Sequence, residues 1–184
     1  MAALSLADYR ARVAAMYLSD RDLAAFRVAR DDLFATHPRS AAPGPLRYFD
    51  PDPGWVVEVS PRPASGFLEI DTGGPDGVLR YERVGILDTP WGPLTLFWLA
   101  AYGGGLFLPF RDATCGRESY GGGRYLYDTV KGADLGTTFD GELVLDLNFL
   151  YAPSCAHDEA WACPLAPPGN RLEVAVTAAE LTSG

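Results

Sequence analysis

The sequence predicts a mostly β fold: a β-rich α+β domain in which an N-terminal helical segment precedes an antiparallel β-barrel or sandwich of about eight strands. Apolar residues recur at helical spacing only in the first 40 residues, whereas short apolar runs typical of strands follow from residue 55 onward. Many of the 20 glycines and 15 prolines lie between these runs and mark turns. At 184 residues the chain fits a single domain, residues 1–184, with residues 1–40 helical and residues 55–180 forming the barrel or sandwich.

Two helix-start signals open the chain. Ser5 and Asp8 have the spacing of a capping box, and the apolar residues after them recur at helical intervals. Ser19 and Asp22 repeat the signal, and Pro38 ends the helical segment that follows. We therefore expect two helices, or one bent helix, that pack one side against the rest of the chain.

Eight apolar segments after the helices have the length and composition of strands. No helical pattern separates them, so an antiparallel arrangement is favoured over a parallel sheet. They span residues 55–59, 67–71, 78–87, 94–101, 106–110, 124–127, 143–149 and 172–177.

The segment 143–149 makes a sharper prediction. Alternate side chains of a strand share one face, so Asp146 and Asn148 would point the same way, about 7 Å apart. Arg124, in the preceding segment, could then pair with Asp146 inside a barrel mouth. That arrangement would be a polar site within an apolar shell.

The composition disfavours several classes of partner. The net charge of −9 argues against nucleic acid, because such a protein lacks the basic stripe that neutralises phosphates. No apolar run approaches the ~20 residues of a membrane span. Charged residues interrupt the first 18 residues, where a signal peptide needs an apolar core. We expect a cytoplasmic protein with three reduced cysteines that binds neither nucleic acid nor membrane.

Several motifs are similar to those of one protein family. They are Leu-Pro-Phe-Arg-Asp-Ala-Thr at residues 108–114, Tyr-Gly-Gly-Gly-Arg-Tyr-Leu at residues 120–126, Leu-Asp-Leu-Asn at residues 145–148, and Cys-Pro-Leu at residues 163–165. Over nearly its whole length the chain resembles the prokaryotic family named domain of unknown function 1684. The name of the family records no known activity, so the resemblance indicates neither a reaction nor a cofactor. Members commonly have Tyr at the position of His157, which argues against a role that needs an imidazole there.

A group of polar residues in this region predicts a pocket for an anionic small molecule. Arginine presents a planar fork that suits a carboxylate or a phosphate. We expect the arginines to hold the anionic group, Asp146 and Asn148 to fix its orientation, and the loop 155–170 to form the rim. The predicted ligand-binding residues are Arg111, Tyr120, Arg124, Asp146, Asn148, Tyr151 and Asn170.

The same residues allow a structural alternative. The two arginines can instead form salt bridges with Asp112, Asp128 or Asp146, as parts of a satisfied internal network. The protein would then be a structural or protein-interaction domain whose function lies on an outer surface.

Cys155, His157 and Cys163 lie close together in the sequence and allow a third alternative, a metal site. The paired short cysteine spacings of most structural zinc sites are absent, so two buried thiols are the default interpretation, with a disulfide as an alternative. Cys155 as a nucleophile and Asp146 as a general base are the candidate catalytic residues. No residue demands a flavin. The cofactor, the substrate, whether the protein is an enzyme, and the oligomeric state stay open.

Overall fold

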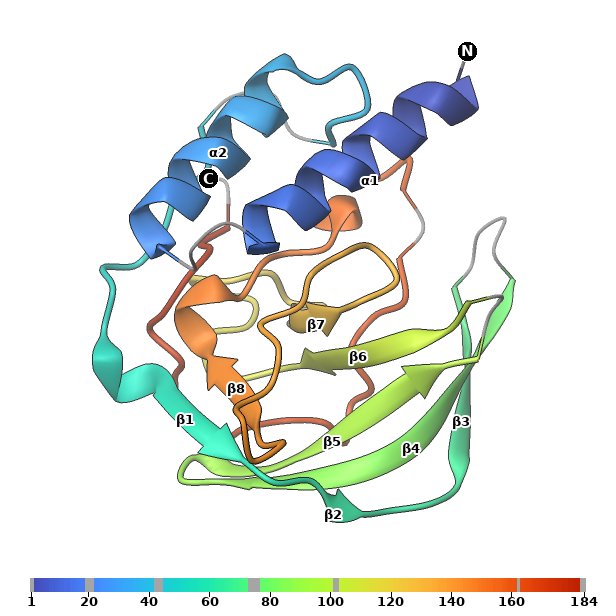
Figure 1. Ribbon diagram of the computed structural model, residues 1–184, viewed down its shortest axis with the longest axis vertical. Coiled ribbons are helices and arrows are strands. Elements are labelled where there is room, and N and C mark those ends of the chain that lie inside the picture. The colour runs from blue at the N-terminus through green and yellow to red at the C-terminus, as the bar shows by residue number, and fades with distance from the viewer. Residues whose placement is uncertain are drawn as a thin grey trace.

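The computed structural model describes residues 2–18, 22–41, 45–72, 77–100, 103–161 and 163–182. In it, two helices lie over one side of a β-rich body (Figure 1). This is the mostly β α+β architecture that the sequence predicts. Within these ranges, no helix combines the length and the apolar character that crossing a membrane requires.

The two N-terminal helices are separate. They are α1 (Ala2–Leu18) and α2 (Leu23–Thr36). The first begins at Ala2, so the start predicted from the capping-box spacing of Ser5 and Asp8 is wrong. The Asp22 side chain accepts hydrogen bonds from the backbone N–H groups of Ala24 and Ala25 and so fixes the start of α2, as predicted. The helix ends two residues before Pro38, also as predicted. The other predicted start, Ser19, lies outside the described residues.

The strands pair in antiparallel fashion and form two sheets within the described ranges. In the larger sheet β2, β4, β5, β6 and β7 are neighbours in that order, and β3 also pairs with β4, while β1 and β8 form the second sheet. Seven of the eight predicted segments overlap a strand, and β2 is the strand that was not predicted. The strands are β1 (Val56–Val59), β2 (Arg62–Pro63), β3 (Phe67–Asp71), β4 (Val78–Thr89), β5 (Gly92–Leu99), β6 (Gly105–Phe110), β7 (Arg124–Asp128) and β8 (Leu143–Asp146).

The predicted strand 143–149 is shorter in the structure. β8 ends at Asp146, and the segment Leu147–Phe149 forms a 3-10 turn. The Asp146 carboxylate accepts hydrogen bonds from the backbone N–H and the side-chain amide of Asn148, both at 2.9 Å, and these bonds compete with continued strand pairing. The prediction that Asp146 and Asn148 project side by side from one strand is therefore wrong.

Residues 172–177 do not form a strand, contrary to the prediction. Here and just beyond, the carbonyl groups of Val176, Ala178 and Glu180 accept hydrogen bonds from the side chain of Arg124. An extended chain presents every second carbonyl on the same side. One guanidinium thus takes the place that a neighbouring strand would occupy.

The core has two main parts, which meet at Tyr151, and a small third cluster of Phe34 and Leu46. In the larger part the helices pack on the β-rich body, and the ring of Phe26 lies 4.9 Å from those of both Tyr17 and Phe149, measured between centroids. The smaller part lies on β4 to β7 and consists of Tyr81, Phe97, Phe107 and Tyr125. Tyr151 packs against both parts, so it stands where the helices meet the sheet.

Candidate functional site

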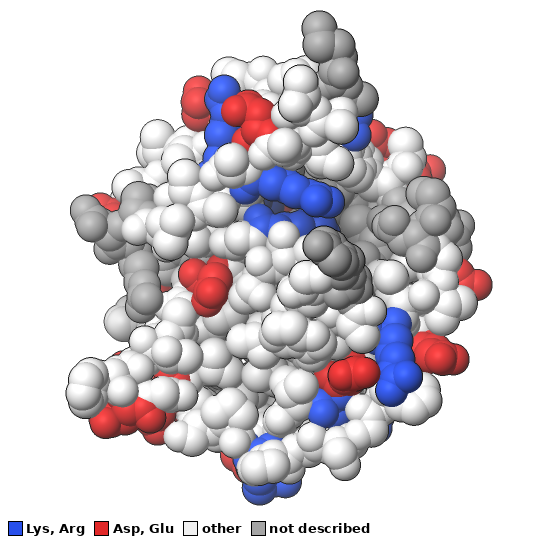
Figure 2. Space-filling model, turned by 45° about the vertical axis from the view of Figure 1, so that its right-hand side comes forward, with Lys and Arg blue, Asp and Glu red and all other residues white. Residues whose placement is uncertain are grey.

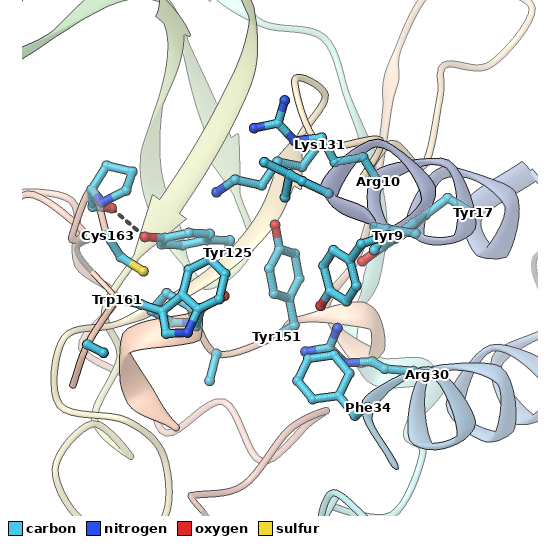
Figure 3. A pocket seen from close by; sticks show the side chains of 17 residues that line it. Tyr9, Arg10, Tyr17, Arg30, Phe34, Tyr125, Lys131, Tyr151, Trp161 and Cys163 are labelled. Carbon is cyan, nitrogen blue, oxygen red and sulfur yellow. Dashed lines mark hydrogen bonds between the residues drawn. The ribbon is translucent and has the colours of Figure 1, made fainter. Parts of the chain in front are cut away.

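A pocket of about 340 Å³ opens between the two helices and the segments that follow β7 and β8; we refer to it as the main pocket (Figure 3). Its lining combines aromatic rings, small apolar side chains and three cationic side chains. The residues are Leu6, Tyr9, Arg10, Val13 and Tyr17 of α1, Arg30 and Phe34 of α2, Tyr125 of β7, Lys131, residues 151–154, and Ala160, Trp161, Cys163 and Pro164.

Six of the 17 residues that line the main pocket are aromatic. The rings of Tyr125 and Tyr151 meet edge to face, with centroids 5.6 Å apart. The Tyr125 hydroxyl donates a hydrogen bond to the carbonyl of Pro164, and the Tyr151 hydroxyl lies 3.5 Å from a carboxylate oxygen of Asp128. The buried hydroxyl of Tyr17 has no hydrogen-bond partner among the described residues. Leaving such a group unpaired costs about 1–3 kcal/mol.

Two cationic side chains stand together on one side of the main pocket. Arg10 and Lys131 are exposed and lie beside each other in Figure 3, whereas Arg30 lies on the opposite side. Lys131 pairs with Asp128, Nζ to Oδ2, at 3.1 Å. The charge of Asp128 and its hydrogen bond to Lys131 raise the pKa of Lys131. Arg10 has no ion pair within the described ranges, so this pocket mouth, defined by Arg10, Lys131 and Asp128, keeps one net positive charge.

Figure 2 shows one face of the molecule coloured by charge. Lys and Arg side chains gather in its upper half, with Asp and Glu side chains beside them at the upper left and uncharged residues below. A local positive charge of this kind is unusual on a chain whose net charge is −9. It attracts anions to that place on the surface.

Arg30 is buried and fixed by a charged network. Its guanidinium donates to Oε2 of Glu180 at 2.8 Å, and Nε2 of His157 lies 2.9 Å from the other carboxylate oxygen of Glu180. The guanidinium also lies over the ring of Phe34, at 4.4 Å, and over that of Tyr151, at 5.2 Å. Burial acts to raise the pKa of Glu180, but Arg30 and His157 outweigh it and hold the pKa below its ordinary value. Glu180 therefore neutralises Arg30 inside the protein.

The predicted ligand-binding residues do not converge on one recess. Tyr151 lines the main pocket, and Arg111 borders a smaller hollow of about 190 Å³ beside Pro167 and Pro168. The other predicted ligand-binding residues (Tyr120, Arg124, Asp146, Asn148 and Asn170) line neither hollow. Their binding roles stay predictions, but the expected shared cavity is absent from the part of the chain described here.

Arg124 pairs with Asp112, not with Asp146 as predicted. The two side chains are fully buried and lie 3.0 Å apart, Nη2 to Oδ2. The other carboxylate oxygen of Asp112 accepts hydrogen bonds from the hydroxyl and the backbone N–H of Thr114 and from the backbone N–H of Val176. This is the structural salt bridge that the sequence left open as an alternative.

Asn148 and Asn170 use their side-chain amides in the way that a peptide group would. Asn148 accepts from the N–H of Asp52 and donates to its carbonyl. Asn170 accepts from the N–H of Thr95 and donates to the carbonyl groups of Thr95 and Pro109. Both amides therefore have their hydrogen bonds satisfied by the protein.

The cysteine-rich loop brings two thiols together but no metal-ligand set. The backbone N–H of Cys155 lies 3.2 Å from Sγ of Cys163, and all three cysteines are free thiols. His157 contacts Glu180 instead of the two thiols. A search of the described residues finds no group of three His, Cys, Asp or Glu side chains that could hold a metal ion. The predicted alternative of a Cys155, His157 and Cys163 metal site is thus not supported.

The cationic residues of the main pocket were missed in the sequence. Arg30 carried a usable signal, because it lies at helical spacing between Phe26 and Leu33 on the apolar face of α2. An arginine on such a face is rarely buried without a partner. Arg10 and Lys131 had no comparable signal, since their proximity depends on how α1 packs on the turn after β7.

Comparisons with known proteins agree with the motif resemblance. The family model described as protein of unknown function (DUF1684) matches residues 44–180. The solution NMR structure of an uncharacterised protein from Haloarcula marismortui is 37% identical, covers 87% of this chain and 92% of that chain, and has a TM-score of 0.54. No curated protein matches the chain. The chain belongs to the family of proteins of unknown function designated DUF1684.

Proposed function

We propose that the protein binds a small molecule in the main pocket, one with a flat apolar or aromatic body and a single anionic group. The observation that carries this proposal is the net positive mouth on a pocket whose wall includes six aromatic side chains. Its volume of about 340 Å³ lies within the range of small-molecule sites. The proposal keeps the anionic ligand predicted from sequence and places it at different residues.

The mouth supplies the selectivity for an anion. Lys131 already has a carboxylate partner in Asp128, whereas Arg10 has none within the described ranges. A carboxylate or phosphate group of the ligand at the mouth would pair with the remaining positive charge, that of Arg10. The buried cation Arg30 is neutralised by Glu180, so it favours stacking on an aromatic body over binding a second anion.

The interior supplies the affinity for the body of the ligand. Tyr9, Tyr125, Tyr151 and Trp161 offer ring faces and edges, which bury a flat molecule well. The unpartnered hydroxyl of Tyr17 offers one hydrogen bond inside the main pocket.

We propose binding alone, without turnover. Asp146, the candidate general base, uses its carboxylate to cap the turn after β8, and it does not border the main pocket. A cytoplasmic location, where the three thiols would stay reduced, is part of the same proposal.

Calorimetric titration with matched pairs of ligands tests the proposal. The probes are benzoate, phenylacetate and indole-3-acetate, each compared with its uncharged primary amide in reducing buffer. We expect at least one acid to bind several-fold more tightly than its amide, and salt to weaken only the acid. If no acid binds at low millimolar concentration, or if acid and amide bind equally, the proposal is wrong.

Two variants of the same helix locate the binding. Arg10→Gln removes the uncompensated charge at the mouth, and we expect it to weaken the acid several-fold. Arg12→Gln is the matched control, because Arg12 pairs with Asp8 on the exposed side of α1 and does not border the main pocket. Equal losses in the two variants would contradict a site at this mouth.

A further inference from the structure

The thiols of Cys155 and Cys163 form a contacting pair that the proposed ligand binding does not use. Cys155 lies in the short turn Ser154–Ala156, and the chain then reverses so that Cys163 returns beside it. The backbone N–H of Cys155 donates to Sγ of Cys163 at 3.2 Å, and the two side chains also share a hydrogen bond. Cys155 is half-buried and remains within reach of solvent, whereas Cys163 is buried.

A tyrosine completes this thiol site. The hydroxyl of Tyr120 lies 3.7 Å from Sγ of Cys155. Burial and the contact with Cys155 raise the pKa of Tyr120 to about 12, so the phenol keeps its proton and can donate it to a thiolate. Tyr120 comes from the loop before β7, so the site joins two distant parts of the chain.

The surroundings of the two thiols shift their pKa values in opposite directions. The hydrogen bond from Cys163 is the largest cause that lowers the pKa of Cys155 to about 6; burial opposes it, and Tyr120 and the charge of Lys131 support it. The same hydrogen bond and burial raise the pKa of Cys163. One thiolate, half-buried and adjacent to one protonated thiol, is the arrangement of redox-reactive cysteine pairs.

We propose that Cys155 and Cys163 are a peroxide-reactive pair, in which Cys155 attacks a small hydroperoxide and Cys163 converts the product into an intramolecular disulfide. The Cys155 thiolate attacks one peroxide oxygen, the O–O bond breaks, and the leaving alkoxide or hydroxide takes a proton from solvent. Cys155 is then a sulfenic acid. Cys163 attacks its sulfur, the S–O bond breaks, and hydroxide leaves as water with the proton of Cys163.

The balance of this reaction is complete without a further cofactor. Two thiols lose two hydrogens and become one disulfide, while the hydroperoxide is reduced to an alcohol, or to water, and one further water. A small dithiol reductant of the cell would restore the pair by thiol–disulfide exchange.

Cys115 provides an internal contrast. Its thiol lies 3.9 Å from a carboxylate oxygen of Asp112 and 3.7 Å from the hydroxyl of Ser119, and no second thiol contacts it within the described ranges. The geometry thus assigns the reaction to the pair and not to this third cysteine.

The test uses the full chain carrying Cys115→Ser, treated with hydrogen peroxide. We expect the intact mass to fall by two hydrogens, and peptide mapping to find residues 155 and 163 linked. At about pH 6 the reaction should be roughly tenfold faster than that of free cysteine, because the larger thiolate fraction outweighs the lower nucleophilicity. An unchanged mass, or oxidation to sulfonic acid without a disulfide, would overturn the proposal.

Two further variants assign the roles. With Cys163→Ser added, we expect a sulfenic acid at Cys155 that dimedone traps, and with Cys155→Ser added, neither disulfide nor trapped product. If the Cys155→Ser protein consumes peroxide as fast as its parent, Cys155 is not the attacking thiol. If a variant with a second cysteine substitution folds poorly, the presence or absence of the disulfide in the Cys115→Ser protein still decides whether Cys155 and Cys163 react as a pair. The outcome of this test does not depend on whether the protein binds aromatic acids.

Discussion

At the scale of single residues, Arg124 shows how one side chain can replace a strand. Its guanidinium binds the carbonyl groups of Val176 and Ala178, at 2.9 and 2.6 Å, together with the carboxylate of Asp112. The carbonyls are satisfied without a neighbouring strand, so the C-terminal segment needs no place in a sheet. Asp112 supplies the counter-charge for Arg124 inside the protein, where both side chains are fully buried.

We predict that Asp112→Asn strongly destabilises the protein. The substitution keeps the shape of the side chain but leaves the guanidinium of Arg124 without its counter-charge, which should cost about 3 kcal/mol in the free energy of unfolding. Urea denaturation at neutral pH measures it. Arg62→Gln, which breaks the exposed pair with Asp88, is the control and should change the midpoint little. Equal shifts of the urea midpoint in the two variants would contradict a large contribution of the buried pair to stability.

Sequence reasoning selected Asn148 and Asn170 correctly as unusual residues, but the kind of role followed from the fold. Each amide side chain pairs with the backbone of a residue far away, Asp52 in one case and Thr95 in the other. A pattern of polar residues signals that hydrogen bonds are needed. It does not reveal whether a ligand or the chain itself provides them.

At the scale of elements, the turn after β7 positions α1. Gly132 has a φ of +89°, and a Cβ placed there would lie 2.6 Å from the Cβ of Ala14 on α1. This close approach sets the distance between the helix and the turn that carries Lys131. The pocket mouth therefore depends on a glycine that does not touch the ligand site.

We predict that Gly132→Ala is more destabilising than Gly141→Ala. Both positions have a positive φ, at +89° and +83°, so both variants carry the backbone strain of about 1–2 kcal/mol. Only Gly132→Ala adds a clash with α1, since nothing lies within 4 Å of a Cβ at Gly141. Thermal unfolding of the two variants isolates the helix contact as the difference between them. Equal melting temperatures of the two variants would contradict a clash between residue 132 and α1.

Elements with local signals were predicted well, and elements that need a partner were not. The start of α2 at Asp22 and its end before Pro38 depend on neighbouring residues only. The segment 172–177 has the composition of a strand, yet its backbone hydrogen bonds with Arg111 and Ala113 are isolated and do not form a ladder. The carbonyl of Val176 binds the side chain of Arg124 instead. Strand formation is decided by pairing, which a local pattern does not contain.

At the scale of the whole molecule, Glu180 connects three distant parts of the chain. It binds Arg30 of α2 at 2.8 Å and lies 2.9 Å from His157 of the cysteine-rich loop. The C-terminal segment is thereby linked to the helices and to the wall of the main pocket. The carboxylate must be ionised for these contacts to stabilise the fold.

We predict that Glu180 contributes stability that is lost in acid. Its pKa in the folded state is below the ordinary 4.5, so its contribution is complete above that pH and disappears as pH falls through the folded pKa. Urea midpoints from about pH 6 down to pH 3 should fall less steeply in Glu180→Gln, which is also less stable at neutral pH. Glu173→Gln, at an exposed position, should follow the wild type. Parallel curves for all three proteins would contradict the prediction.

The sequence by itself determined the fold class, the family and most of the helix and strand positions, because hydrophobic period, caps and turn residues act over a few neighbours. It also pointed to the right motifs, since buried polar residues such as Asp112, Arg124 and Asn170 need partners wherever they lie. Only the tertiary structure decided which partners they have and where the pocket lies. Arg10, Lys131 and Tyr151 come from three distant parts of the chain, and packing of α1 on the β-rich body brings them together. Such long-range contacts are fixed by the total burial of the molecule and not by any local pattern.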